Sequence, residues 1–217
     1  MRAKVIKAEN ISPTTKLFTL KTLSKGFSFL PGQFISFSIK KENNLAVRAY
    51  SFCSLPVELP QFELCVRQVR SGIGTTFLNE NIGKTVEFSG TQGDFILPSN
   101  IKGDLVFLAA GVGIAPVRSQ LRYLYENRPE FGSTLIYQCR QDEYLFGGEL
   151  KKMARSWRKF NLFIKPGGRK NFNIKKRDLP DTIQMIYVVG PPGFVNLSLE
   201  ILHGFGYDNQ VIKFDIW

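Results

Sequence analysis

Over the first hundred residues, short apolar runs rich in Val, Ile, Phe and Thr alternate with turn residues such as Pro31-Gly32. The pattern predicts six strands, near residues 3–9, 15–22, 33–40, 48–54, 61–69 and 84–90. Six strands with short connections are typical of an antiparallel barrel. One stretch, residues 71–78, interrupts them and is typical of a loop that opens a short helix.

After Pro98 the pattern changes, and strands alternate with helices. Residues 105–110 form a continuous apolar run that is too short for a helix and suits a parallel strand buried on both faces. A helix is expected over about residues 115–127. Further strands are expected at 134–139, 161–165, 184–189 and 210–215, and further helices at 148–157 and 194–203. This alternation predicts a parallel α/β sheet with right-handed crossovers.

The fold class expected is therefore β plus α/β, in two domains. Residues 1–98 would form the six-stranded antiparallel barrel, and residues 103–217 a parallel α/β nucleotide-binding lobe. The longest apolar run, residues 105–117, contains two glycines and a proline and cannot cross a bilayer as a helix. The first ten residues lack the apolar core of a signal peptide. We expect a soluble, cytoplasmic protein with no membrane insertion.

The few thiols and the single imidazole exclude several kinds of site. Cys53, Cys65 and Cys139 are odd in number and widely spaced, so they supply neither a disulfide framework nor a four-thiolate iron–sulfur ligand set. His203 is the only histidine, which excludes a His-rich zinc site and a triad with a His base. The chemistry must use a cofactor, a carboxylate or a hydroxyl, and no metal site is expected.

The net charge of +11 is unevenly distributed. Between Lys151 and Arg177 the chain has 11 basic residues and no acidic one. This run is either a solvated helix face with its loops or a docking surface for an acidic protein, a phosphate or nucleic acid. Because the run contains no recognisable nucleic-acid module, we do not expect a nucleic-acid partner.

Two glycine-containing turns follow predicted strands in the second half of the chain. At residues 111–113 the sequence Gly-Val-Gly opens a helix, with Pro116 where a dinucleotide fingerprint has its third glycine. At residues 190–193 the sequence Gly-Pro-Pro-Gly opens another. Each is either a structural turn or a helix N-terminus that binds a diphosphate. Both are expected at the C-terminal edge of the sheet, where open α/β folds bind ligands.

A second group of polar residues lies in the barrel. Arg48, Tyr50 and Ser51 share one strand, and period-2 spacing puts Ser51 on the opposite face from the other two unless the strand bends. A bound anion beside an aromatic ring system would explain Arg48 and Tyr50 together, whereas the alternative is an exposed strand. Gly72 and Thr75 open a helix in a spacing suited to phosphate.

Seven motifs follow one another along the chain: Phe29-x-Pro31-Gly32-Gln33-Phe34, Arg48-x-Tyr50-Ser51, Gly72-x-x-Thr75-x-x-Leu78, Gly90-x-x-Gly93-Asp94-Phe95, Gly111-x-Gly113-x-x-Pro116, Gly190-Pro191-Pro192 and the aromatic C-terminus. Their order resembles the ferredoxin–NADP⁺ reductase superfamily. The resemblance covers essentially the whole chain, and its specific part is the pair RxYS and GxGxxP.

The resemblance implies a flavin-binding barrel, with FAD or alternatively FMN, joined to a lobe that binds NADPH or NADH. Arg48 would bind the flavin phosphate, Tyr50 would pack on the isoalloxazine, and Ser51 would bond near its N5. Gly72 and Thr75 would hold the flavin phosphates. By the same resemblance Gly111, Gly113 and Pro116 would border the diphosphate of the nicotinamide nucleotide, with Gly190, Pro191, Pro192 and Arg140 as further nucleotide contacts.

The aromatic chain end completes the implied site. Trp217 would cover the other flavin face and move when nicotinamide arrives, which makes Tyr50, Ser51 and Trp217 the expected catalytic residues. Asp215 is either a proton relay or a plain surface carboxylate. One departure concerns the third motif: the family has Cys before Gly-Pro, where this chain has Val189, and Cys139 does not replace it. Together, Lys165 and Arg169 would favour NADPH by holding a 2′-phosphate.

The implied function is a flavoprotein oxidoreductase that passes a hydride from NAD(P)H to bound FAD and then single electrons to an external acceptor. A charge of +11 suits an acidic ferredoxin or flavodoxin as that acceptor. Two alternatives stay open. One is an NAD(P)H:flavin reductase with flavin as a diffusing substrate, and the other is an electron-transfer accessory subunit in which Val189 marks lost hydride transfer.

Overall fold

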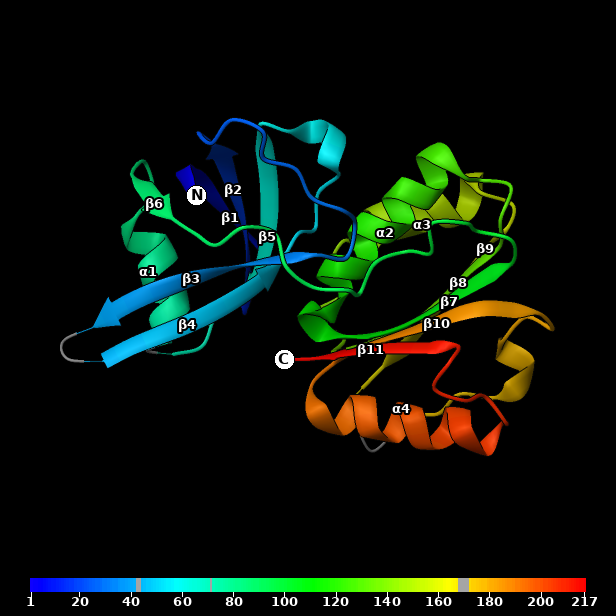
Figure 1. Ribbon diagram of the computed structural model, residues 1–217. Coiled ribbons are helices and arrows are strands. Elements are labelled where there is room, and N and C mark those ends of the chain that lie inside the picture. The colour runs from blue at the N-terminus through cyan, green and yellow to red at the C-terminus, as the bar shows by residue number, and fades with distance from the viewer. Residues whose placement is uncertain (42–43, 71, 168–171) are drawn as a thin grey trace.

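The computed structural model describes residues 1–41, 44–70, 72–167 and 172–217, and its antiparallel half contains two sheets (Figure 1). A four-stranded sheet has the order β5-β2-β1-β6, and a two-stranded sheet pairs β3 with β4. The strands are β1 (Arg2–Ser12), β2 (Thr15–Thr22), β3 (Phe34–Lys41), β4 (Asn44–Ser51), β5 (Gln61–Arg67) and β6 (Thr85–Glu87). The helix expected near residue 75 is α1 (Ile73–Glu80). All six predicted strands form, divided four and two rather than in one continuous barrel.

Phenylalanine fills the space between these two sheets. Phe37, Phe52 and Phe62 are fully buried there, and the Phe29 ring stacks on Phe52 with centroids 3.9 Å apart. A bridge between Phe52 and Leu64 then joins the end of β4 to β5. The chain thus curls the two sheets around one aromatic core, since burial of such rings is the main stabilising term available to a small β domain.

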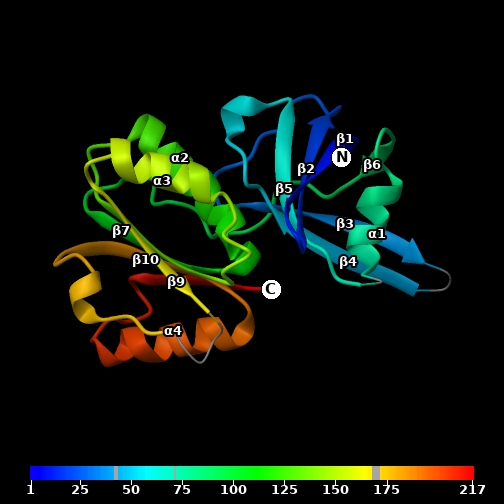
Figure 2. The ribbon, with the colours of Figure 1, turned by 180° about the vertical axis from the view of Figure 1, so that it is seen from behind.

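The second half is a five-stranded parallel sheet of order β11-β10-β7-β8-β9. Its strands are β7 (Asp104–Ala110), β8 (Ser133–Cys139), β9 (Phe160–Pro166), β10 (Ile183–Gly190) and β11 (Ile212–Ile216). Helices α2 (Ile114–Asn127) and α3 (Gly147–Ser156) cover one face, and α4 (Pro192–Gly204) covers the other (Figure 2). The fold class predicted from the sequence is confirmed. The last strand begins two residues later than expected.

The two halves meet where α2 packs against β5. Cys53 and Cys65 share a hydrophobic cluster with Ala115 of α2. Polar contacts cross the same boundary: the Ser119 hydroxyl donates to the Ser54 carbonyl at 2.6 Å. The domain limits at residues 98 and 103 stay a prediction. Within the described residues, no helix combines the length and the apolar character that a membrane crossing needs.

Candidate active site

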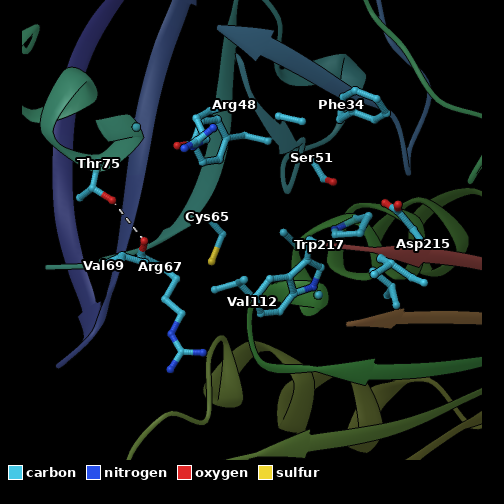
Figure 3. Close-up of a pocket in the computed structure, with 18 of the residues that line it drawn as sticks. Phe34, Arg48, Ser51, Cys65, Arg67, Val69, Thr75, Val112, Asp215 and Trp217 are labelled. Carbon is cyan, nitrogen blue, oxygen red and sulfur yellow. Dashed lines mark hydrogen bonds between the residues drawn. The ribbon is translucent and has the colours of Figure 1, made fainter. Parts of the chain in front are cut away.

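A cavity of about 550 Å³ lies at the junction of the two halves, a volume typical of small-molecule sites. Figure 3 shows that its walls come from both halves, with Arg48, Ser51 and Thr75 facing Val112, Asp215 and Trp217. The residues expected from the sequence that line it are Arg48, Tyr50, Ser51, Gly72, Thr75, Gly113, Pro116 and Trp217. Segments far apart in the sequence thus converge on one space.

The end of β4 places three of these side chains together. Ser51 pairs with Phe34 of β3, and the next residue, Phe52, bridges to Leu64 of β5. Tyr50 and Ser51 both line the cavity although they are adjacent in the strand. Ser51 therefore borders the same cavity as Arg48 and Tyr50, although period-2 spacing separates their faces.

Arg48 is available to bind an anion. Its Nη1 donates to the neighbouring carbonyl of Val47 at 2.8 Å, and within the described part of the chain no carboxylate lies at ion-pair distance. Burial raises the pKa of the Tyr50 phenol, an effect that the positive charge of Arg48 opposes. The phenol is therefore neutral at physiological pH, and its ring offers an apolar face beside an unpaired cation.

Helix α1 begins directly against this pair. Its N-cap is Gly72, no side chain caps it, and no acidic residue occupies its first turn, so its N-terminus favours an anion. A Cβ at Gly74 would collide with the Tyr50 hydroxyl and lie 3.2 Å from Cγ of Arg48. The hydroxyl of Thr75 donates to the Arg67 carbonyl at 3.2 Å, which engages its proton within the protein (Figure 3). Ser71 lies outside the described residues.

The turn after β7 forms the opposite wall through Val112 and Gly113, whereas Gly111 itself does not line the cavity. Gly111 adopts a φ of +54°, in the left-handed region that favours glycine. A Cβ at Gly113 would come within 2.6 Å of the Val189 carbonyl oxygen and 3.3 Å of Nε1 of Trp217. No side chain caps α2 at this end. Val189 itself is buried and presents an apolar surface to the cavity where the family has a thiol.

The chain end lies across this turn. The backbone N–H of Trp217 donates to the Gly190 carbonyl at 3.4 Å, and its side chain is 45% exposed. Asp215 lies on the cavity wall and is partly buried, so it is not a plain surface carboxylate. Burial raises the pKa of Asp215, an effect to which the charge of Asp94 adds and which a backbone hydrogen bond opposes.

Other expected contacts lie beside the cavity or away from it. Gly190, Pro191 and Pro192 form the turn between β10 and α4, with Pro191 as the N-cap, but do not line the cavity. Arg140 is 62% exposed and lies 3.6 Å from an Asp142 carboxylate oxygen.

The two cations expected to hold a 2′-phosphate give that role little support. Lys165 lies within β9 and faces Asp178 at 3.5 Å, so its charge is already paired. Arg169 lies outside the described residues. Lys165 therefore gives no support to a preference for NADPH over NADH.

The basic run between Lys151 and Arg177 is not one surface. Lys151 and Lys152 are exposed on α3, whereas Lys176 donates to the Phe205 carbonyl just beyond α4. Because α3 and α4 cover opposite faces of the sheet, the run is divided between the two sides (Figure 1). The prediction that the whole run forms one docking surface is therefore wrong.

Two further residues, Cys65 and Arg67, line the cavity from β5 and were not predicted as site residues. They alternate with Glu63 along the strand, so all three share one face. This alternation could have indicated the site from the sequence, because a strand face that carries two charged side chains is unsuited to the apolar core of a barrel. Burial holds the pKa of Cys65 well above its usual value, so the thiol stays protonated.

These residues fit a dinucleotide of flavin and a nicotinamide nucleotide. An unpaired Arg48 and two uncapped helix N-termini suit phosphates. Rings on both walls, Tyr50 and Trp217, suit flat aromatic groups. The absence of a Cβ at Gly74 lets the Tyr50 hydroxyl lie against α1. Its absence at Gly113 lets β10 and the Trp217 indole lie against the turn, so both glycines bring the two sides of each wall together.

Comparison with known proteins gives a family and a fold. Residues 2–96 match the oxidoreductase FAD-binding domain family. The gamma subunit of sulfhydrogenase 1 from Pyrococcus furiosus is 31% identical over 225 aligned positions, which cover 95% of this chain and 75% of that protein. The reductase component of phenol 2-monooxygenase from Pseudomonas sp. strain CF600 is 26% identical, over 89% of this chain and 58% of its own length.

Solved structures share the fold across the whole chain. The FAD/NAD binding domain of nitric oxide dioxygenase from Vibrio cholerae superposes with a TM-score of 0.83 at 20% identity, covering 100% of this chain and 98% of that one. A ferredoxin-NADP⁺ reductase from Plasmodium falciparum gives 0.83 at 17% identity, covering 100% and 95%. Each likeness extends over both halves of this chain.

Proposed function

This chain belongs to the ferredoxin–NADP⁺ reductase superfamily, and we propose that it takes a hydride from NADPH or NADH onto bound FAD and passes single electrons to a separate protein acceptor. The enzyme class, an NAD(P)H-dependent flavin oxidoreductase that uses FAD, follows from the family. The observation that best supports the proposal is that one cavity is lined on one side by Arg48, Tyr50 and Ser51 and on the other by the turn at Gly113.

FAD supplies the conversion of a two-electron hydride into single-electron steps when it is bound. The chain's own residues bind and orient. Arg48 and the N-terminus of α1 would hold phosphate, and the Tyr50 ring would exclude water from one face. Ser51 would offer its hydroxyl as a hydrogen-bond donor at the reacting edge, and the Gly113 turn would bring the nicotinamide nucleotide against it.

Trp217 would act as a displaceable cover. Its indole occupies the space over Gly113, with Nε1 only 3.3 Å from where a Cβ would stand. A nicotinamide ring that enters this space must displace it. The side chain is 45% exposed, so few contacts oppose that movement.

The acceptor would be an acidic electron-transfer protein such as a ferredoxin or a flavodoxin. The 217 residues contain only three cysteines, all buried, and so lack the ligands of an iron–sulfur cluster that could relay electrons. The chain spans between 41% and 75% of the length of the curated relatives compared with it, so its partners are proposed rather than carried over from them. A net charge of +11 would steer an acidic partner towards it.

Turnover with such an acceptor should fall as salt rises. Raising NaCl from about 0.05 to 0.5 M shortens the Debye length from roughly 14 to 4 Å. The second-order rate constant for reduction of a ferredoxin or flavodoxin is then expected to drop about tenfold or more. Stopped-flow reduction at constant nucleotide measures it, with small neutral quinones as the control acceptor. Equal salt dependence for both acceptors would contradict docking by charge.

A further inference from the structure

An ion-pair cluster centred on Arg118 joins the two halves next to residues that line the cavity. Arg118 of α2 donates from Nη1 to a Glu63 carboxylate oxygen at 2.7 Å and to the Cys53 carbonyl at 2.8 Å, both in the antiparallel half. Its Nε donates to a Glu149 carboxylate oxygen of α3 at 2.7 Å. The Phe146 ring stacks 4.3 Å from its Cζ, and only 11% of the side chain is exposed. Arg118 is thus fixed on every side.

Arg118 and Glu63 each lie close in sequence to a residue that lines the cavity, one on each wall. Along β5, Glu63 and Cys65 point to the same face, and Cys65 lines the cavity. Along α2, Arg118 lies three residues after Ala115, on the same face, and Ala115 also lines the cavity. The contact between Arg118 and Glu63 therefore joins the two elements, β5 and α2, that carry these parts of the cavity walls.

Stability alone does not account for such a cluster. Ion pairs removed from water cost desolvation, and apolar residues of similar size often replace them without loss of folding free energy. What the planar guanidinium adds is geometry, because its hydrogen bonds fix direction as well as distance. Hydride transfer depends on that geometry: a misplacement of about 1 Å costs roughly a hundredfold in rate.

We propose that Arg118 is a positioning residue that holds the nicotinamide-binding wall at the hydride-transfer distance from the flavin-binding wall. The inference rests on the proposed function. Removing the side chain would leave the halves attached, because Ser119 still bonds the Ser54 carbonyl and Gln120 still bonds the Phe95 carbonyl at 2.7 Å. The halves would stay together with a looser angle between them.

The test compares three variants. R118M removes the cluster's centre, and E63M/R118M replaces the pair across the two halves with apolar side chains, while Glu149 keeps its 3.3 Å contact with Arg122. The matched control is R122M, which removes another bond between the halves, from Arg122 to Glu58 at 2.8 Å, one helical turn farther from the cavity. The four proteins are compared by flavin content, unfolding temperature, Kd for ADP-ribose by calorimetry, and rate of flavin reduction at saturating nucleotide.

In both Arg118 variants the rate of flavin reduction at saturating nucleotide should be about tenfold to a hundredfold lower than in the wild-type protein. Flavin content and the Kd for ADP-ribose should stay unchanged, because each of these ligands contacts chiefly one wall. E63M/R118M should unfold near the wild-type temperature and still react slowly, and R122M should react at nearly the wild-type rate. A stable E63M/R118M protein that reacts at the wild-type rate would overturn the inference alone. A wild-type protein that binds no ADP-ribose and is reduced by neither nucleotide would overturn the proposed function with it.

Discussion

The Arg48→Met variant is expected to lose its flavin. Two charge-assisted hydrogen bonds from a guanidinium to a phosphate are worth about 3 kcal/mol or more, so the Kd for FAD should rise about a hundredfold or more. Among the described residues, Arg67 of β5 is the one other basic side chain that lines the cavity, and it lies on a different strand from the Arg48-Tyr50-Ser51 motif. The measurement is the ratio of flavin to protein after gel filtration, followed by titration of the stripped protein with FAD.

Two further variants make the Arg48 result specific. Arg48→Lys keeps the charge but not the planar fork, and should give an intermediate Kd. Arg128→Met removes an exposed arginine that pairs with Glu130 at 3.5 Å, and should leave flavin binding unchanged. If Arg48→Met retains its flavin as tightly as Arg128→Met does, Arg48 does not hold the phosphate.

The Gly113→Ala variant is expected to keep its flavin and lose reduction by nucleotide. The backbone of Gly113 has an ordinary helical φ of −58°, so the conflict is steric: the added Cβ would lie 2.6 Å from the Val189 carbonyl oxygen. Either this turn or β10 must shift, at a cost of about 1–3 kcal/mol of folding free energy. A displacement near 1 Å at the nicotinamide wall should slow flavin reduction roughly a hundredfold.

A second glycine provides the control for Gly113. Gly148 lies in the first turn of α3, and a Cβ there meets no atom within 4 Å. Gly148→Ala should therefore leave the reduction rate unchanged and, if anything, stabilise the helix by up to about 1 kcal/mol. Dithionite should bleach the flavin of both variants, which separates loss of hydride transfer from loss of flavin. Gly113→Ala reduced by nucleotide as fast as Gly148→Ala would show that the turn does not border the reacting ring.

The hydrophobic pattern predicted the elements because each element's periodicity is local. The apolar run at β7 is buried along almost its whole length, and the alternation of strands with helices led correctly to the parallel sheet. The strand limits were less accurate at edges, such as β6, where only three residues pair. The division of six strands into sheets of four and two depends on pairings between distant segments, which no local pattern records.

The candidate site was predicted where a motif is contiguous and missed where contacts join distant segments. Arg48, Tyr50 and Gly113 belong to short motifs and line the cavity. Arg118 belongs to no motif in the sequence, and no local pattern connects it to its partner Glu63, which is 55 residues away along the chain. Lys165 was expected to be free to bind a phosphate, because its partner Asp178 is 13 residues away and no local pattern connects the two.

The central claim is that nicotinamide reduces a flavin held in the cavity between Arg48 and Gly113. Anaerobic titration of the purified protein with NADPH, and separately with NADH, followed by visible absorption, tests it most directly. We expect a yellow protein that at least one nucleotide bleaches at about one equivalent per flavin, with Val189 in place of the family's cysteine. A yellow protein that dithionite bleaches and neither nucleotide does would contradict the claim.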